Sequence, residues 1–230
     1  MDQLQIREKE IFETLKAIKN FKFVIIGGYA VNAYALPRFS VDCDIIIKEY
    51  EELEKIKKEL IKIGYKEEGK ESGNIPYHGN FFRYEKIINN NFKSSIDILF
   101  NEVLDRQTNA VFNAKWVFDN SVIKLLKGKT ITEELKVRII NLDALIVMKT
   151  ISCRNTDIRD VFMLSTKTKD IEWIKKEVLN RYDLKDRFDK IKEKITSKKF
   201  KDDLRGVHGY IEQKAFDKNI KAILKIANSI

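Results

Sequence analysis

The chain has 230 residues, of which 43% are hydrophobic and 34% are charged. This length gives one large domain, or one domain with a helical extension, and it supplies enough apolar residues for a substantial buried core. No stretch approaches the roughly 20 apolar residues that cross a bilayer. The first residues also lack the apolar segment of a signal peptide, so we expect neither a membrane protein nor a secreted one.

The charge and the cysteines bear on the partners and the compartment. The formal net charge is +9, and residues 183–230 contribute +5 of it because they hold 13 basic and 8 acidic residues. Such an excess suits a nucleic-acid or nucleotide partner, although a lysine-rich composition gives the same charge without one. Cys43 and Cys153 are too few for a metal framework, and they indicate a protein of the reducing cytoplasm.

The first elements in the chain are a helix, a buried strand and a glycine turn. Apolar residues recur at helical spacing over residues 3–20, which predicts an amphipathic helix. Val24 to Ile26 is an uncharged β-branched run, typical of a buried strand. Gly27-Gly28 allows a sharp turn and a close approach of the backbone to a ligand. A short helix is predicted over residues 29–36, and the N–H groups at its start would favour phosphate.

Two aspartates mark the next predicted strand. Asp42 and Asp44 are two residues apart, so their side chains share one face, about 7 Å apart along the chain. Like charges on one face repel each other, and a divalent cation with oxygen ligands offsets that repulsion. Residues 95–100 form a second apolar strand with one carboxylate, Asp97. If the two strands are neighbours, three carboxylates converge and form a site for one or two Mg²⁺ ions that hold a nucleoside triphosphate.

The remaining pattern alternates helices and strands before it becomes helical. We predict a helix over 49–63 that stops at Gly64, a short strand and a loop over 65–74, strands at 81–88 and 92–100 around a turn at 89–91, a mainly helical stretch over 101–118, and strands at 122–126 and 135–140. Helices follow at 142–152, 157–165, 171–182, 184–195 and 210–227, with a break around Gly206 and Gly209. Lys149 falls on the apolar stripe of the first of these helices, so it lies at the edge of the core or points into a site.

These motifs together resemble the DNA polymerase β-like nucleotidyltransferase superfamily. The resemblance rests on Gly27-Gly28, on Asp42-Cys43-Asp44 and on Ile96-Asp97-Ile98 at their spacing. The run Pro37-Arg38-x-Ser40-x-Asp42 resembles the AbiEii-like stand-alone nucleotidyltransferases, with serine in place of the usual threonine. Many of these relatives are toxins of toxin–antitoxin pairs. We therefore expect an α+β fold with a mixed sheet flanked by helices, a catalytic core over residues 1–140 and a helical C-terminal region over residues 141–230.

The resemblance also implies an activity and roles for particular residues. It implies transfer of a nucleoside monophosphate from a nucleoside triphosphate such as ATP to a hydroxyl acceptor, with Mg²⁺ or Mn²⁺ and with release of pyrophosphate. The catalytic and metal-binding residues would be Asp42, Asp44 and Asp97, and Asp97 would help to deprotonate the attacking hydroxyl. The nucleotide-binding residues would be Gly27, Gly28, Arg38, Ser40 and Lys149.

Several alternatives stay open at the level of the sequence. The acceptor can be a tRNA 3′ end, which the toxin-like relatives and the basic C-terminal region favour, or a protein side chain or a small molecule. A cognate antitoxin would be a further partner. The alternative from another class is a non-catalytic module that binds a nucleotide or a partner protein on the same fold. The sequence sets neither the base of the nucleotide nor the oligomeric state.

Overall fold

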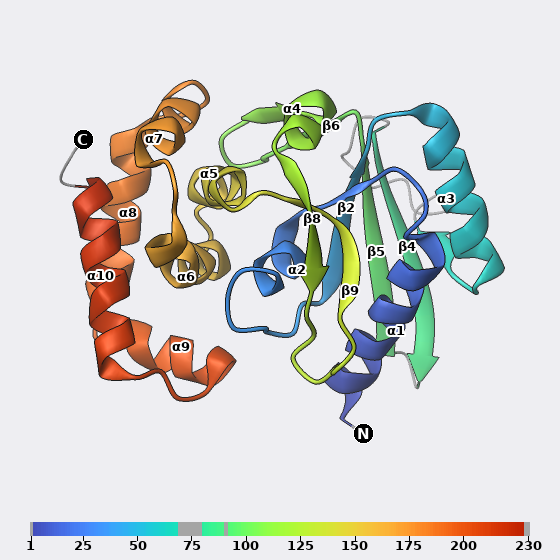
Figure 1. Cartoon of the computed structure of the whole chain (residues 1–230), viewed down its shortest axis with the longest axis horizontal. Coiled ribbons are helices and arrows are strands. Elements are labelled where there is room, and N and C mark those ends of the chain that lie inside the picture. The colour runs from blue at the N-terminus through green and yellow to red at the C-terminus, as the bar shows by residue number, and fades with distance from the viewer. Residues whose placement is uncertain (1, 69–79, 90–91, 228–230) are drawn as a thin grey trace. The chain divides into compact units, whose positions relative to one another are not determined.

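The computed structural model describes residues 2–68, 80–89 and 92–227 (Figure 1). The chain forms two compact units. Unit 1 comprises Met1–Ala33, Phe39–Val103 and Phe112–Ile140, and unit 2 comprises Tyr34–Arg38, Leu104–Val111 and Asn141–Ile230. The catalytic core over residues 1–140 stays a prediction, because the compact units describe packing and not function.

Unit 1 is built on a mixed sheet that has seven strands in the described residues, in the order β3-β4-β5-β2-β1-β9-β8 (Figure 1). The strands are β1 (Val24–Ile25), β2 (Asp42–Ile47), β3 (Lys66–Glu68), β4 (Phe81–Asn89), β5 (Phe92–Phe100), β8 (Ser121–Leu126) and β9 (Leu135–Ile140). The pairs β2–β5 and β1–β9 are parallel, and the other pairs are antiparallel. The predicted α+β class with a mixed sheet is therefore confirmed, and so is the pairing of the two strands that carry the aspartates.

The helices of unit 1 cover this sheet. They are α1 (Gln3–Ile18), α2 (Gly27–Asn32), α3 (Tyr50–Lys62) and α4 (Ala114–Asp119). Helix α1 packs on β5 and on α3, and it buries Ile11 and Leu15 completely. Helix α3 stops where the sequence predicts, because Gly64 adopts the left-handed conformation with φ of 96°.

The prediction for α2 was wrong at both ends. The helix begins at Gly27 itself, because glycine at φ of 64° lets the chain turn directly from Ile26 into the helix. It ends at Asn32 instead of Leu36. A proline disfavours the helical conformation of the residue before it, so Leu36 does not continue the helix.

The mainly helical prediction for residues 101–118 was also wrong. This stretch contains a two-stranded sheet of β6 (Glu102–Leu104) and β7 (Val111–Asn113), and only α4 is helical. Between the two strands, Asp105 Oδ1 accepts hydrogen bonds from Thr108 Oγ1 and from the backbone N–H groups of Gln107 and Thr108. Asn109 then adopts φ of 57°. Local side-chain bonds of this kind give the backbone an alternative to a helix.

Unit 2 is helical apart from its share of the two-stranded sheet. Its elements are α5 (Leu142–Ser152), α6 (Asn155–Leu164), the 3₁₀ turn η1 (Ser165–Lys167), α7 (Ile171–Leu179), α8 (Leu184–Thr196), α9 (Phe200–His208) and α10 (Gln213–Ala227). Buried side chains from α6, α8, α9 and α10 form one apolar core, which includes Phe162, Ile191, Phe200, Leu204 and Ile223.

Three predictions near the C-terminus need correction. Helix α9 was not predicted, and Gly206 lies inside it, so the chain breaks only at Gly209, where φ is 78°. Helix α7 ends at Leu179, three residues early, and α10 begins at Gln213. The predicted turn at 89–91 and loop at 65–74 lie partly outside the described residues.

Two further findings concern predictions from composition. In the described part of the chain, no helix is long and apolar enough to span a bilayer. Both cysteines are free thiols. Cys43 is a residue of β2 and is fully buried, whereas Cys153 is partly exposed.

Candidate active site

The parallel pairing of β2 and β5 brings the predicted carboxylates together in unit 1. Asp44 lies directly opposite Asp97, and Asp42 lies opposite Ser95. Because side chains alternate along a strand, Asp42 and Asp44 share one face of β2, while Cys43 and Ile45 between and after them are buried on the other. The register therefore gathers three acidic side chains on one face, as the sequence predicts.

An arginine that the sequence analysis did not select holds one of these acids. Arg83 on β4 is the cross-strand partner of Asp97. Its Nε lies 2.8 Å from Asp97 Oδ1 and its Nη2 lies 2.6 Å from Asp97 Oδ2, so the ion pair is bidentate. The same Nη2 lies 3.9 Å from Asp42 Oδ2. The signal was in the sequence, because counting outward from the predicted turn at 89–91 pairs Arg83 with Asp97.

Burial makes Asp97 unlike a surface aspartate. Its side chain is only 5% exposed, whereas that of Arg83 is 36% exposed. Burial raises the pKa of Asp97 above its usual range, and the attraction of Arg83 offsets this rise only in part. The bond to Asp97 in turn raises the pKa of the Arg83 guanidinium. A buried carboxylate whose charged form is disfavoured is a candidate for proton transfer or for binding a cation.

Gly27 brings the backbone against the second aspartate. A Cβ atom at this position would lie 1.9 Å from Asp44 Oδ2, closer than any real contact. The N–H of Ile26 donates a 3.0 Å hydrogen bond to the carbonyl of Asp44, which holds β1 against β2 at this point. Only glycine fits here, on grounds of both space and its φ of 64°. The predicted glycine motif and the predicted acids thus meet in one place.

The donor set suits a divalent cation in its chemistry. Three carboxylates supply the hard oxygen ligands that Mg²⁺ and Mn²⁺ prefer. As these side chains stand, no group of three or more metal-ligating residues in the described chain is arranged to hold an ion. The bidentate pair with Arg83 engages both oxygens of Asp97. By their chemistry these carboxylates fit a divalent metal ion.

Two of the predicted nucleotide-binding residues meet in unit 2. Arg38 donates from Nε and Nη2 to the two oxygens of Asp160, at 2.9 and 2.7 Å. Lys149 Nζ lies 3.0 Å from Asp160 Oδ2 and 2.7 Å from Asp157 Oδ1. Ser40, by contrast, lies partly buried in the segment that leads into β2 in unit 1. The structure thus brings Arg38 and Lys149 together on one carboxylate.

This ion network is buried, and its charges stabilise one another. Burial by itself would raise the pKa of Asp160, but Lys149 and Arg38 outweigh it and hold the pKa below its usual range. Burial would likewise lower the pKa of Lys149, and Asp160 and Asp157 raise it instead. Lys149 and Asp160 are therefore both charged at neutral pH. The sequence showed Lys149 on the apolar stripe of its helix, and the two aspartates explain how a buried position accepts it.

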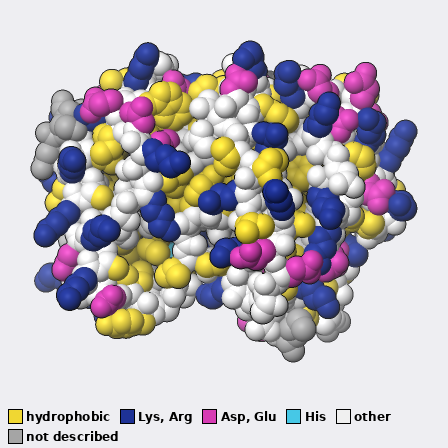
Figure 2. Space-filling model, viewed as in Figure 1, with side chains coloured by type: hydrophobic (Ala, Val, Ile, Leu, Met, Phe, Trp, Pro, Cys, Tyr) yellow, Lys and Arg dark blue, Asp and Glu magenta, His cyan; other side chains and the backbone are white. Residues whose placement is uncertain are grey.

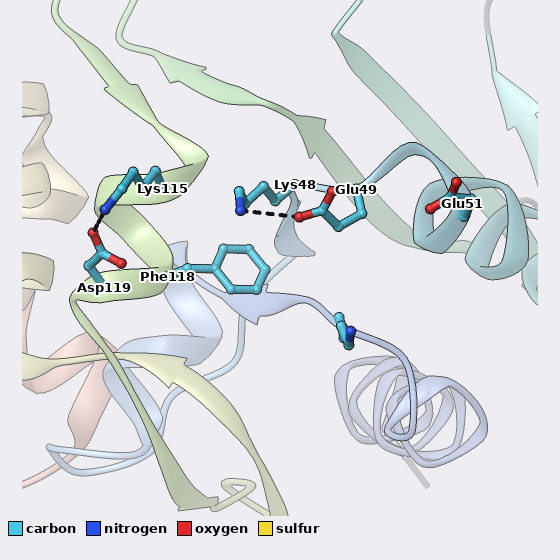
Figure 3. Close-up of a pocket in the computed structure, with 7 residues that line it drawn as sticks. Lys48, Glu49, Glu51, Lys115, Phe118 and Asp119 are labelled. Atoms are coloured by element: carbon cyan, nitrogen blue, oxygen red, sulfur yellow. Dashed lines mark hydrogen bonds and ion pairs between the residues drawn. The ribbon is translucent and has the colours of Figure 1, made fainter.

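One hollow of unit 1 lies at the other end of β2. It has a volume of about 400 Å³ and is lined by residues that include Lys48, Lys115 and Phe118. Figure 3 shows the Phe118 ring directed into it, between the ion pair of Lys48 with Glu49 and that of Lys115 with Asp119. Lys48 follows the last residue of β2, whereas the acids belong to its first half. This hollow is therefore separate from the acidic cluster.

Comparison with known proteins identifies the family of this chain. The family described as "Nucleotidyl transferase AbiEii toxin, Type IV TA system" matches residues 13–224. The chain belongs to this family, and it is a nucleotidyltransferase. The resemblance seen in the sequence is confirmed. Among proteins with curated functions, none matches the sequence.

Solved structures share the fold. A nucleotidyltransferase from H. pylori has a TM-score of 0.55 and 14% identity, with 100% of this chain and 96% of that chain covered. JHP933 from Helicobacter pylori gives a TM-score of 0.55 and 14% identity, with 100% and 94% covered. MenT4, a nucleotidyltransferase toxin from Mycobacterium tuberculosis, gives a TM-score of 0.57 and 10% identity, with 99% and 85% covered. At these identities the likeness supports the fold.

Proposed function

We propose that this nucleotidyltransferase moves a nucleoside monophosphate from a nucleoside triphosphate to a hydroxyl group of RNA, with a tRNA 3′ end as the first candidate, and releases pyrophosphate. The observation that carries the proposal is the meeting of Asp44, Asp97 and Gly27. The two acids are register partners, and the backbone of Gly27 lies against Asp44.

The acidic cluster would hold the metal. Asp42 and Asp44 share a face of β2 and would bind Mg²⁺ or Mn²⁺, with Asp97 joining them. When bound, such an ion neutralises phosphate charge and makes the phosphorus more electrophilic. The glycine pair Gly27-Gly28 at the start of α2 would let backbone N–H groups approach the triphosphate near Asp44.

Asp97 would serve the acceptor. Its buried position raises the pKa of its carboxyl group, and a raised pKa suits a general base at neutral pH. It would accept the proton of the attacking hydroxyl group, and this would make the hydroxyl oxygen a stronger nucleophile. Asp42 is more exposed than Asp97 and would act as a metal ligand alone, whereas Asp97 would both join the metal site and accept the proton.

The nucleotide-binding roles of Arg38, Ser40 and Lys149 stay predictions. The bonds of Arg38 and Lys149 to Asp160 support a structural role for these two cations. Measurements of stability and of nucleotide affinity on Lys149 variants distinguish the two roles.

The choice of RNA rests on charge. The chain carries +9, with +5 in residues 183–230, and a polyanion is the partner that such an excess favours. Figure 2 shows lysine and arginine side chains spread over the visible face among acidic ones, instead of gathered in one groove. The family description, which names a toxin of a toxin–antitoxin system, supports a cognate antitoxin as a second partner.

The proposal is tested by incubating the purified protein with each α-labelled nucleoside triphosphate, Mg²⁺ and total tRNA, and by resolving labelled RNA, protein and small molecules together. We expect label in RNA, none without Mg²⁺, and weaker RNA binding as salt rises. Label in protein or in a small molecule would overturn the choice of acceptor. Label in no fraction, with any of the four nucleotides, would contradict transfer to these acceptors.

A further inference from the structure

The guanidinium group of Arg83 lies among the carboxylates of the acidic cluster, next to Asp97 and near Asp42. It donates to both oxygens of Asp97, at 2.8 and 2.6 Å, and lies 3.9 Å from Asp42 Oδ2. It therefore brings one positive charge to two of the three carboxylates. Neither the resemblance nor the predicted site residues included this arginine.

The sheet fixes this position. Arg83 and Asp97 are direct partners in the antiparallel pair β4–β5, and side chains at such positions project from the same face within about 5.5 Å of each other at Cβ. Asp97 is 5% exposed, so its charge needs a partner inside the protein. Arg83 is 36% exposed, so its guanidinium can turn to water without a large desolvation change. Asp97 is therefore held in place by burial, whereas the Arg83 side chain can move away from it into solvent.

Charge repulsion opposes simultaneous occupation. Each oxygen of Asp97 keeps a further lone pair, but a metal ion shared by Asp97 and Asp42 would lie within a few ångströms of the Arg83 guanidinium. Two cations that close repel each other strongly in a partly buried site. In the described chain, no group of three metal-ligating side chains is ready to hold an ion as it stands.

We propose that Arg83 is a displaceable counter-ion of the acidic cluster, which holds Asp97 in the metal-free protein and must leave it before a divalent cation binds. This inference rests on the proposed function in one respect, namely that the cluster takes such a cation. Arg83 is a positioning residue on this account. It keeps the sheet folded without metal, and it lowers the affinity for metal.

Mn²⁺ binding to the full chain tests the proposal without any need for activity. The free ion is followed by its paramagnetic resonance signal, with Arg83→Gln compared with the unchanged protein. We expect Arg83→Gln to bind Mn²⁺ about tenfold more tightly, the factor that about 1.4 kcal/mol of relieved repulsion gives. We also expect a lower melting temperature without metal and a larger rise in it when Mn²⁺ is added. An arginine that only supports the fold would give weaker binding instead.

Three further variants keep the result interpretable. Arg138→Gln removes the same charge from an exposed position on β9 of the same sheet, and its Mn²⁺ affinity should equal that of the unchanged protein. Arg83→Lys keeps the charge but loses the bidentate geometry, so it should bind Mn²⁺ with an intermediate affinity, even if Arg83→Gln does not fold. In an Asp97→Asn background, Arg83→Gln should tighten binding much less, because the shared partner is gone.

The outcomes separate this inference from the proposed function. Equal or weaker Mn²⁺ affinity in Arg83→Gln and Arg83→Lys overturns the inference. If the unchanged protein still binds Mn²⁺ and Asp44→Asn does not, the metal site of the proposed function stands. If none of the folded proteins binds Mn²⁺, both the inference and the proposed metal site fall.

Discussion

The backbone of Gly27 lies against the carboxylate of Asp44, so closely that a Cβ atom at residue 27 would lie 1.9 Å from Asp44 Oδ2. The two residues come from different elements, the start of α2 and the strand β2. Their contact therefore depends on the turn that follows β1. Through this contact the position of Gly27 limits where the Asp44 carboxylate can lie. A methyl group added at residue 27 tests whether that limit matters for activity.

Gly27→Ala should damage the site more than the fold. The methyl group would push the Asp44 carboxylate aside, and alanine at φ of 64° adds about 1–2 kcal/mol of backbone strain. We expect loss of nucleotidyl transfer by more than about 100-fold, since a small misplacement of a reacting group can have an effect of that size. Transfer and thermal unfolding of the variant are the measurements.

Gly206→Ala is the matched control for that change. Gly206 lies inside α9, and a Cβ atom there would have nothing within 4 Å. Alanine should therefore raise the free energy of unfolding by about 0.5–1 kcal/mol and leave transfer unchanged. If Gly27→Ala kept full transfer, the close approach of Gly27 to Asp44 would have no part in the activity.

Asp44→Asn tests the carboxylate itself. The change keeps the shape of the side chain and its place opposite Asp97, but it removes the negative charge that would bind metal. Changes to the partners of metal ligands lower activity about 10–100-fold, so loss of a ligand should lower transfer by more than about 100-fold. The melting temperature should change little.

Asp119→Asn is the control for Asp44→Asn. Asp119 is an exposed aspartate at the end of α4, paired with Lys115. An exposed pair of this kind contributes about 0–1 kcal/mol, so both stability and transfer should stay near their original values. Transfer by Asp44→Asn at the level of Asp119→Asn would remove Asp44 from the proposed mechanism.

Much of this site could be predicted because its signals are local. The two-residue spacing of Asp42 and Asp44 follows from the alternation of a strand, and Asp97 stands alone in an apolar run. The Asp44–Asp97 register itself comes from strand pairing across the sheet, which no local pattern contains. Arg83 was missed for a different reason: its pairing follows from the predicted hairpin, but only when the register is counted outward from the turn.

The errors in the fold have physical causes of the same kind. Residues 101–118 were predicted to be mainly helical. However, Asp105 Oδ1 accepts a hydrogen bond from the backbone N–H of Thr108, and Asn109 adopts a left-handed conformation, so the chain turns there instead. Gly206 reads as a helix breaker, but packing of the buried residues of α9 outweighs its weak propensity. The pairing of Arg38 with Asp160 was beyond prediction, because the two residues are 122 positions apart in the sequence.

Lys149→Met distinguishes a structural role for Lys149 from nucleotide binding. Lys149 is bonded to Asp157 and Asp160, and removing its charge leaves these buried acids with less compensation. We expect the free energy of unfolding to fall by about 3–5 kcal/mol, as measured by urea denaturation. If Lys149 is structural, the folded variant will bind nucleotide with little change in affinity.

The control for this variant is Lys185→Met. Lys185 pairs with Asp189 on the exposed face of α8, where an ion pair four residues apart contributes about 0.3–0.5 kcal/mol. Its loss should hardly change the denaturation midpoint. Unchanged stability of Lys149→Met, together with weaker nucleotide binding, would contradict the structural role and restore the role predicted from the sequence.

The same network predicts how stability depends on pH. Burial would raise the pKa of Asp160, but Lys149 and Arg38 hold it below its usual range. A carboxyl group with a lowered pKa contributes stability above its unfolded pKa, about 3.9, and this contribution is lost as the pH falls through the folded pKa. Asp160→Asn has no such group, and at neutral pH it should be less stable by about 3–5 kcal/mol.

The difference in unfolding free energy between the unchanged protein and Asp160→Asn should therefore be largest from pH 5 to 7 and should narrow below about pH 4. Urea denaturation of both proteins at a series of pH values measures it, and the other carboxyl groups cancel because both proteins carry them. A constant difference down to the acid limit of folding would mean that Asp160 does not titrate below its usual range. The contribution of Lys149 and Arg38 at this site would then come from packing and hydrogen bonds instead of charge.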